Sequence, residues 1–289
     1  GNEVWLVTFG GALFAAFPVA YATILSAFYI PVMMLLSLLI LRAVSVDFRN
    51  KVQTSAWKFL WEVGFFISSA GATYVFGVAA GNWLQGIPID ESGDYLGTTL
   101  ALFNPYSISV GVLALATFAL QGFAFLILKT TKELKQKLSG MIWTFWGFFL
   151  VSYILVSMFT LIEQEHVVEN IRQNYWPIPI VIANVLAVAN LPRCILKGHY
   201  GQAFISSSLN IACLVAIFGL SLYPTIVYST GPGESLSIQD AASSQNTLWL
   251  MFIFACVGLP LILSYTAIIY WTFRKAIDVE ETMVLKEKQ

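Results

Sequence analysis

Long stretches without Asp, Glu, Lys or Arg alternate along this chain with short segments that hold most of its charges. Seven such apolar blocks occur, and each reaches the roughly 20 residues that a helix rising about 1.5 Å per residue needs to cross a hydrocarbon core of about 30 Å. The pattern therefore predicts an all-α, polytopic membrane protein with seven transmembrane helices. The blocks are residues 4–41, 63–89, 95–128, 138–162, 173–192, 198–233 and 241–273.

The charged segments between the blocks alternate in sign. Basic residues dominate the first, third and fifth segments and open the tail, whereas the second, fourth and sixth are acidic, with Arg172 the one exception among the cations. Loops rich in Lys and Arg stay on the cytoplasmic side of a membrane. The pattern therefore predicts a cytoplasmic C-terminus. The fourteen residues that follow it are Arg42, Arg49, Lys51, Lys58, Lys129, Lys132, Lys135, Lys137, Arg193, Lys197, Arg274, Lys275, Lys286 and Lys288.

Seven spans and a cytoplasmic C-terminus place the N-terminus outside. The chain begins at Gly1 without a signal-peptide pattern, so we expect at least one further span upstream in the natural protein. Residues 1–289 are expected to form a single transmembrane helical domain, of which 278–289 are a charged cytoplasmic tail.

The amino-acid composition excludes several classes of function. Hydrophobic residues make up 58% of the chain and charged residues 11%, and a net charge of −1 argues against nucleic acid as a partner. The three cysteines lack metal-ligand spacing, and phosphate loops, nucleophile elbows and zinc helices are missing. His166 is expected to be solvated among outer carboxylates, and His199 to lie at the membrane interface. A self-contained active site is therefore not expected, and no metal ligands are predicted.

The candidate residues are ionisable groups at the basic edge of the membrane. Asp47 follows the first span, and Glu62 lies where the next apolar run is already under way. A carboxylate at that depth is costly when ionised, so it is paired, protonated or functional. Simpler roles stay open for two of these residues: Glu62 as a helix-start acid favoured by the helix dipole, and Arg42 as a side chain that snorkels to the surface.

The first block is too long for one straight crossing, and Pro18 interrupts it. A short outer helix over residues 2–17 is expected to lead into a span over 21–41. Its small residues permit close helix approach, either within the chain or with a partner. Those packing candidates are Gly10, Gly11, Ala12, Ala15 and Ala16, and Asn2 and Glu3 are candidates for a polar site at the outer edge.

Several segments, taken together, resemble subunit II of the cytochrome bd quinol oxidases. The resemblance covers nearly the whole chain in order and is weaker between residues 139 and 200. The matching segments are Gly1-Asn2-Glu3-Val4-Trp5-Leu6, Gly10-Gly11-Ala12-Leu13-Phe14-Ala15-Ala16-Phe17-Pro18, Leu41-Arg42, Asp47-Phe48-Arg49, Trp61-Glu62 with Gly64, Gly77-Val78-Ala79 with Gly81-Asn82, Gly86-Ile87-Pro88, Asn104-Pro105, Ala242-Ser243-Ser244 with Thr247-Leu248, and Tyr265-Thr266-Ala267 with Tyr270-Trp271.

This resemblance implies an eight-span subunit in the bacterial cytoplasmic membrane that pairs with a haem-bearing subunit I. The partner would hold haems b and d, with none ligated by this chain, and the complex would oxidise quinol from the quinone pool and reduce oxygen to water. Asp47 and Glu62 match family positions proposed for a proton path from the cytoplasm, and Arg42 matches a nearby basic residue. Many relatives have Asp where this chain has Glu62. A structural quinone or lipid and small accessory subunits are further expectations.

Two alternative functions compete with this one. A stand-alone transporter or channel would need polar groups near mid-membrane in several spans, and this chain has few, chiefly Asn184, Asn190 and Asn210. A purely structural subunit would use Glu62 and Asp47 only in helix capping and salt bridges. The sequence alone gives little basis for distinguishing a purely structural subunit from one that carries protons.

Overall fold

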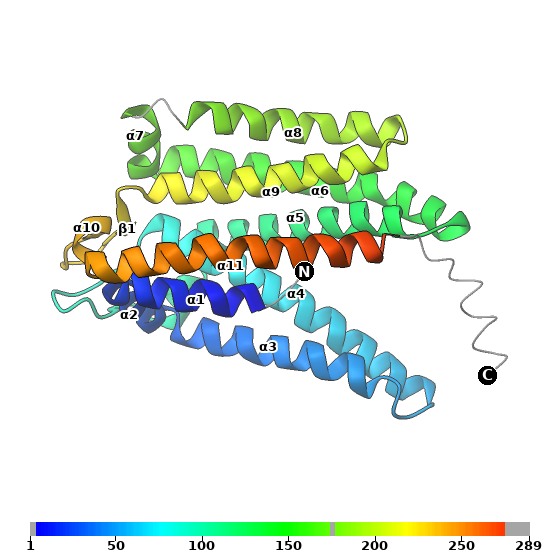
Figure 1. Cartoon of the computed structure of the whole chain (residues 1–289), viewed down its shortest axis with the longest axis horizontal. Helices are drawn as coiled ribbons and strands as arrows, with labels where there is room; N and C mark the ends of the chain where they lie inside the picture. Colours follow the sequence, from blue (N-terminus) through cyan, green and yellow to red (C-terminus); the bar gives the residue numbers. More distant parts are fainter. Residues whose placement is uncertain (1–3, 174–176, 275–289) are drawn as a thin grey trace.

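A computed structural model describes residues 4–173 and 177–274 of the chain, and its long helices run roughly parallel to one axis (Figure 1). Seven of them are long and apolar enough to cross a membrane. The prediction of an all-α protein with seven spans is confirmed. The seven helices are α3 (Tyr29–Phe48), α4 (Ser55–Gln85), α5 (Pro105–Lys129), α6 (Lys132–Glu163), α8 (Ile178–Leu196), α9 (Tyr200–Leu222) and α11 (Gln245–Thr272).

Both ends of the bundle agree with the charge pattern. The α3–α4, α5–α6 and α8–α9 turns lie at the same end as the end of α11, so the basic segments share one end (Figure 1). The opposite, acidic end carries the smaller elements that follow α4, α6 and α9. These are the 3₁₀ helix η1 (Thr99–Leu102), α7 (Glu165–Gln173), an antiparallel pair of β1 (Thr225–Val227) and β2 (Leu236–Ser237), and α10 (Ile238–Ala241).

The first apolar block folds as three helices: α1 (Val4–Ala16), α2 (Pro18–Ala27) and α3. Pro18 interrupts the block, as expected, and it opens the separate helix α2. A second break falls at Phe28, because Pro31 has no N–H to donate to the carbonyl of Ala27 and its ring crowds that carbonyl. The span therefore covers Tyr29–Phe48, later in the chain than the predicted 21–41.

Glycines bring α4 and α5 into close contact. A Cβ added to Gly77 would lie 2.7 Å from the Cα of Gly111, and one added to Gly81 would lie 2.8 Å from the Cα of Ser107. Near the same end, Asn82 donates to the carbonyl of Leu102 at 2.6 Å. The buried residues of α4 all belong to its second half, from Ser68 onward, where these contacts lie.

The largest apolar core lies among α5, α6, α8 and α9, which are grouped together in Figure 1. Leu120 and Ile127 of α5, Ile142 and Phe149 of α6, and Leu191 of α8 are almost fully buried there. Helix α11, by contrast, has no buried residue in this chain, and neither has α1. The N–H of Ser243, just before α11, donates to the carbonyl of Ala16 at the end of α1 at 2.8 Å.

Candidate functional site

The ionisable candidates at the basic end belong to the α3–α4 pair, which inclines away from the other helices towards that end (Figure 1). The first half of α4, up to Ile67, has no buried residue, so it lacks the close packing that the second half makes with α5. Charged side chains on this part of α4 do not have to fit inside the bundle. The site therefore lies on the outside of the described bundle.

Glu62 is ion-paired with Arg49. Its Oε1 accepts hydrogen bonds from Nε of Arg49 at 2.9 Å and from a terminal guanidinium nitrogen at 2.5 Å. The Glu62 side chain remains 51% exposed, and the Arg49 side chain remains 44% exposed. Charge-assisted hydrogen bonds of this kind are short and directional. The pair thus fixes the carboxylate while leaving it open on one side.

Arg42 lies one heptad before Arg49 on the same face of α3. Its guanidinium carbon is 5.8 Å from the ring centroid of Phe65 on α4, within the range of a cation–π interaction. Between the two arginines, Ser45 is buried against α4, and a Cβ on Gly64 would lie 3.2 Å from its hydroxyl. This face of α3 therefore presents two cations to α4.

Asp47 lies elsewhere on α3. With 3.6 residues per turn, it is displaced by about 160° from Arg49, so it faces away from α4 and from Glu62. Its side chain is exposed. The structure therefore brings Glu62 together with Arg49 and leaves Asp47 on the far side of the same helix.

Aromatic side chains hold the turn between α3 and α4. The indole N–H of Trp57 donates to the carbonyl of Phe48 at 2.8 Å, and Trp61 packs against the rings of both residues. Trp61 immediately precedes Glu62. This cluster fixes the register of the two helices and hence the distance between Arg49 and Glu62.

Arg49 is the residue that sequence reasoning did not select. Its spacing of seven residues from Arg42 was the available signal, since residues one heptad apart share a helix face. The structure also excludes a helix-dipole role for Glu62. It is the eighth residue of α4, two turns from the helix start, whereas the dipole effect falls off within the first turn.

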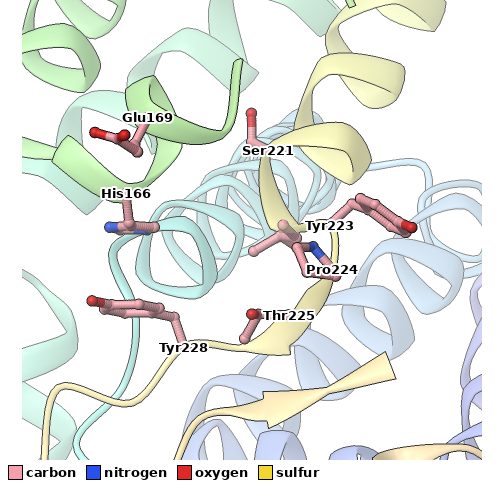
Figure 2. Close-up of a pocket in the computed structure, with 8 residues that line it drawn as sticks. His166, Glu169, Ser221, Tyr223, Pro224, Thr225 and Tyr228 are labelled. Carbon is pink, nitrogen blue, oxygen red and sulfur yellow. The ribbon is translucent and has the colours of Figure 1, made fainter. Parts of the chain in front are cut away.

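A second cluster lies at the acidic end, around a cavity of about 240 Å³ between α7 and the α9–β1 junction (Figure 2). His166 stacks on Tyr228 with ring centroids 4.2 Å apart, and its Nε2 donates to the carbonyl of Leu84 at 2.8 Å. His166 is thus half-buried and bonded to α4, and the expectation that it is solvated is wrong. The remaining lining residues are Glu169, Ser221, Leu222, Tyr223, Pro224 and Thr225.

The two histidines lie far from each other in the bundle. His166 offers its Nε2 to a backbone carbonyl, and the exposed His199 lies at the opposite end of the bundle, before α9. Among residues 4–173 and 177–274, no three His, Cys, Asp or Glu side chains gather as metal ligands.

The remaining candidates belong to the first residues of the chain and to α1. Asn2 and Glu3 lie outside the described residues. Apart from the backbone of its own helix, a Cβ on Gly10 or Gly11 would meet no atom of the described residues within 4 Å, so these two glycines are not used for close packing among them. Ala12 is exposed, and Ala15 and Ala16 are partly buried. Close packing of this segment against a partner helix stays a prediction.

Comparisons with known proteins give matches over nearly the whole chain. The sequence profile of the family described as cytochrome bd terminal oxidase subunit II matches residues 1–273. Cytochrome bd-I ubiquinol oxidase subunit 2 of Escherichia coli strain K12 is 34% identical over 315 residues, which cover 97% of this chain and 82% of that protein. Cytochrome bd ubiquinol oxidase subunit 2 of Bacillus subtilis strain 168 is 30% identical over 283 residues, covering 98% and 83%.

The fold has a counterpart among solved structures. The bd oxidase from Geobacillus thermodenitrificans contains a chain that matches with a TM-score of 0.75 at 18% sequence identity. The match covers 93% of this chain and 81% of that one. At this level of identity the likeness is one of fold.

Proposed function

This chain belongs to the cytochrome bd terminal oxidase subunit II family, and on that premise we propose that it pairs with a haem-bearing subunit I and carries protons from the cytoplasm toward the partner's oxygen site. Family membership makes it a multi-pass subunit of an oxidoreductase complex in a bacterial cytoplasmic membrane. The names of the Escherichia coli and Bacillus subtilis relatives specify ubiquinol, and we propose a quinol as the reductant of this complex as well. Membership also favours this function over a stand-alone transporter.

The observation that carries the proton role is the Glu62–Arg49 pair. An acid at the membrane edge is stabilised by a paired cation, and this one keeps half of its side-chain surface open. It lies on the part of α4, before Ser68, that has no buried residue. A partner subunit that packs there would enclose the carboxylate at the interface, where it can exchange a proton with a hydrated path.

The residues of this chain divide the work in this proposal. Glu62 holds and releases the proton, Arg49 positions its carboxylate, and Arg42 lies on the same face of α3 one heptad earlier. Asp47, on the opposite face of α3, collects protons from solvent. Because its side chain points away from Glu62, it passes these protons on through water. The haems, held by the partner, supply the electron transfer and oxygen reduction. A bound quinone or lipid and accessory subunits stay predictions.

The test is Glu62→Gln in the complete oxidase, because Gln keeps the shape and hydrogen-bonding capacity but cannot carry the proton. We expect quinol-driven oxygen consumption to fall by about tenfold or more, in line with the loss of a proton-transfer group, while the absorption bands of the haems are retained. Glu91→Gln, an exposed acid at the opposite end, is the matched control and should leave turnover unchanged.

Two results would contradict the proposal. Unchanged turnover in Glu62→Gln would remove Glu62 from the proton path. Loss of the haem bands from the purified variant would show that Glu62 acts in assembly with subunit I. Glu62→Asp, which restores the residue type of many relatives, should recover most of the turnover if proton transfer is the function.

A further inference from the structure

A polar seam runs along the contact between α8 and α9, inside the same core as the buried apolar residues. The Nδ2 of Asn190 donates to the hydroxyl of Ser206 at 2.8 Å, and the Nδ2 of Asn184 donates to Oδ1 of Asn210 at 3.0 Å. Because the helices are antiparallel, the second pair lies deeper from the basic end than the first. Asn184 and Asn210 are both 0% exposed.

The hydrogen bonds at the deeper pair form a series in which each side chain donates to the next. The hydroxyl of Tyr153, on α6, donates to Oδ1 of Asn184 at 2.6 Å. Asn184 in turn donates to Asn210, at both its side-chain oxygen and its backbone carbonyl. The chain of donors ends at Nδ2 of Asn210, which has no acceptor within the described residues.

Ser207 adds a second unpartnered group about one turn earlier on α9. It precedes Asn210 by three residues and therefore shares its face of α9. Its side chain is 1% exposed, and its Oγ has no hydrogen-bond partner among residues 4–173 and 177–274. Buried polar groups left without partners are costly in an apolar interior, and more so within a bilayer.

We propose that Asn210 and Ser207 bind a buried water molecule inside the α5–α6–α8–α9 bundle. A water oxygen accepts from Nδ2 of Asn210 and forms a second hydrogen bond with the hydroxyl of Ser207. Buried waters typically make about three such bonds. The groups that meet here are amides and hydroxyls without a formal charge, and the amide presents a hydrogen. A neutral acceptor therefore fits better than a cation or an anion.

This water site extends a network that joins α6, α8 and α9. It is separate from the Glu62–Arg49 pair and contains no carboxylate, ammonium or imidazole group. Its role is to hold three helices in register at mid-bundle, so it stands or falls independently of the proton proposal.

A map of the complete oxidase, at a resolution that shows ordered water, tests the site directly. We expect a density peak within about 3.2 Å of both Nδ2 of Asn210 and Oγ of Ser207. The peak should vanish in Asn210→Leu. Its absence from the wild-type map, where other internal waters are visible, would overturn the proposal.

Thermal unfolding of the same complex gives a second readout. If water bridges the two groups, Ser207→Ala removes one of its partners and should lower the Tm of the subunit by a few degrees. If the interior is dry, Ser207→Ala removes an unpaired hydroxyl, and a raised Tm would overturn the proposal. Ser152→Ala is the matched control, because the buried Ser152 hydroxyl donates within its own helix, to Phe148, and needs no water.

Discussion

Asp90, in the connection between α4 and η1, shows how one side chain organises a turn at the acidic end. Its Oδ1 accepts from the backbone N–H of Asp94 at 2.8 Å and of Ser92 at 2.9 Å, and from the Ser92 hydroxyl at 3.0 Å. The bond from Asp94, followed by the Ser92 hydroxyl, lowers the pKa of Asp90 below its ordinary value. The ionised carboxylate is therefore the form that the turn prefers.

This preference makes a pH-dependent prediction. A carboxylate whose folded pKa is depressed stabilises the fold above its unfolded pKa of about 3.9, and that contribution disappears as pH falls through the folded pKa. Asp90→Asn should therefore lower the Tm modestly at pH 6, with the difference from wild type shrinking towards pH 3. Thermal unfolding of both proteins across this range is the measurement. A difference that grows as the pH falls would contradict it.

Single residues also mark the limit of sequence reasoning about the site. Glu62 was identifiable because an acid inside an apolar run is unusual. Its pairing with Arg49 was not, because the contact joins two helices and depends on the register that Trp57 and Trp61 impose. The separation of Asp47 from Glu62 likewise depends on which face of α3 meets α4.

At the scale of helices, the α4–α5 contact makes a sharp prediction. A methyl group on Gly77 would lie 2.7 Å from the Cα of Gly111 and 2.9 Å from the carbonyl oxygen of Val110, so the two backbones must separate. Gly77→Ala should therefore destabilise the subunit by about 1–3 kcal/mol, the usual cost of overpacking. Urea or thermal unfolding in detergent would measure this loss.

Gly122 on α5 provides the control. A Cβ there meets nothing within 4 Å, and Ala is a better helix former than Gly by up to about 1 kcal/mol. Gly122→Ala should be neutral or slightly stabilising. Equal losses for Gly77→Ala and Gly122→Ala would show that helix approach is not what Gly77 provides.

The charge-free blocks located the spans but not the ends of the helices. Helix α4 begins at Ser55, eight residues before its uncharged block, because a helix continues past the membrane edge through Lys58 and Glu62. The break at Phe28 follows from Pro31, three residues later, and could have been found from that proline. Strand β1 was hidden near the end of an apolar block and β2 in the acidic segment after it, because strands this short leave no distinct pattern in the sequence.

For the whole molecule, hydrophobic blocks and alternating charge were enough to predict seven spans and the clustering of basic turns at one end (Figure 1). Those properties arise from transfer between water and hydrocarbon, which depends on composition along the chain. The contacts made by the surfaces of α1 and α11 do not depend on composition in this way. Neither helix has a buried residue, so the packing of the described residues does not determine what their surfaces contact.

The orientation of the bundle is itself a prediction, since the positive-inside rule places the basic end in the cytoplasm. Gln53→Cys, in the α3–α4 turn, and Glu91→Cys, in the α4–η1 connection, put exposed thiols at opposite ends. In a Cys256→Ala background, which removes the exposed native thiol, a membrane-impermeant maleimide should label Glu91→Cys in intact cells and Gln53→Cys only after permeabilisation. The background without an added cysteine controls for reaction at buried Cys194 and Cys213. The reverse pattern would place the Glu62–Arg49 pair on the outer face, where it could not take up cytoplasmic protons.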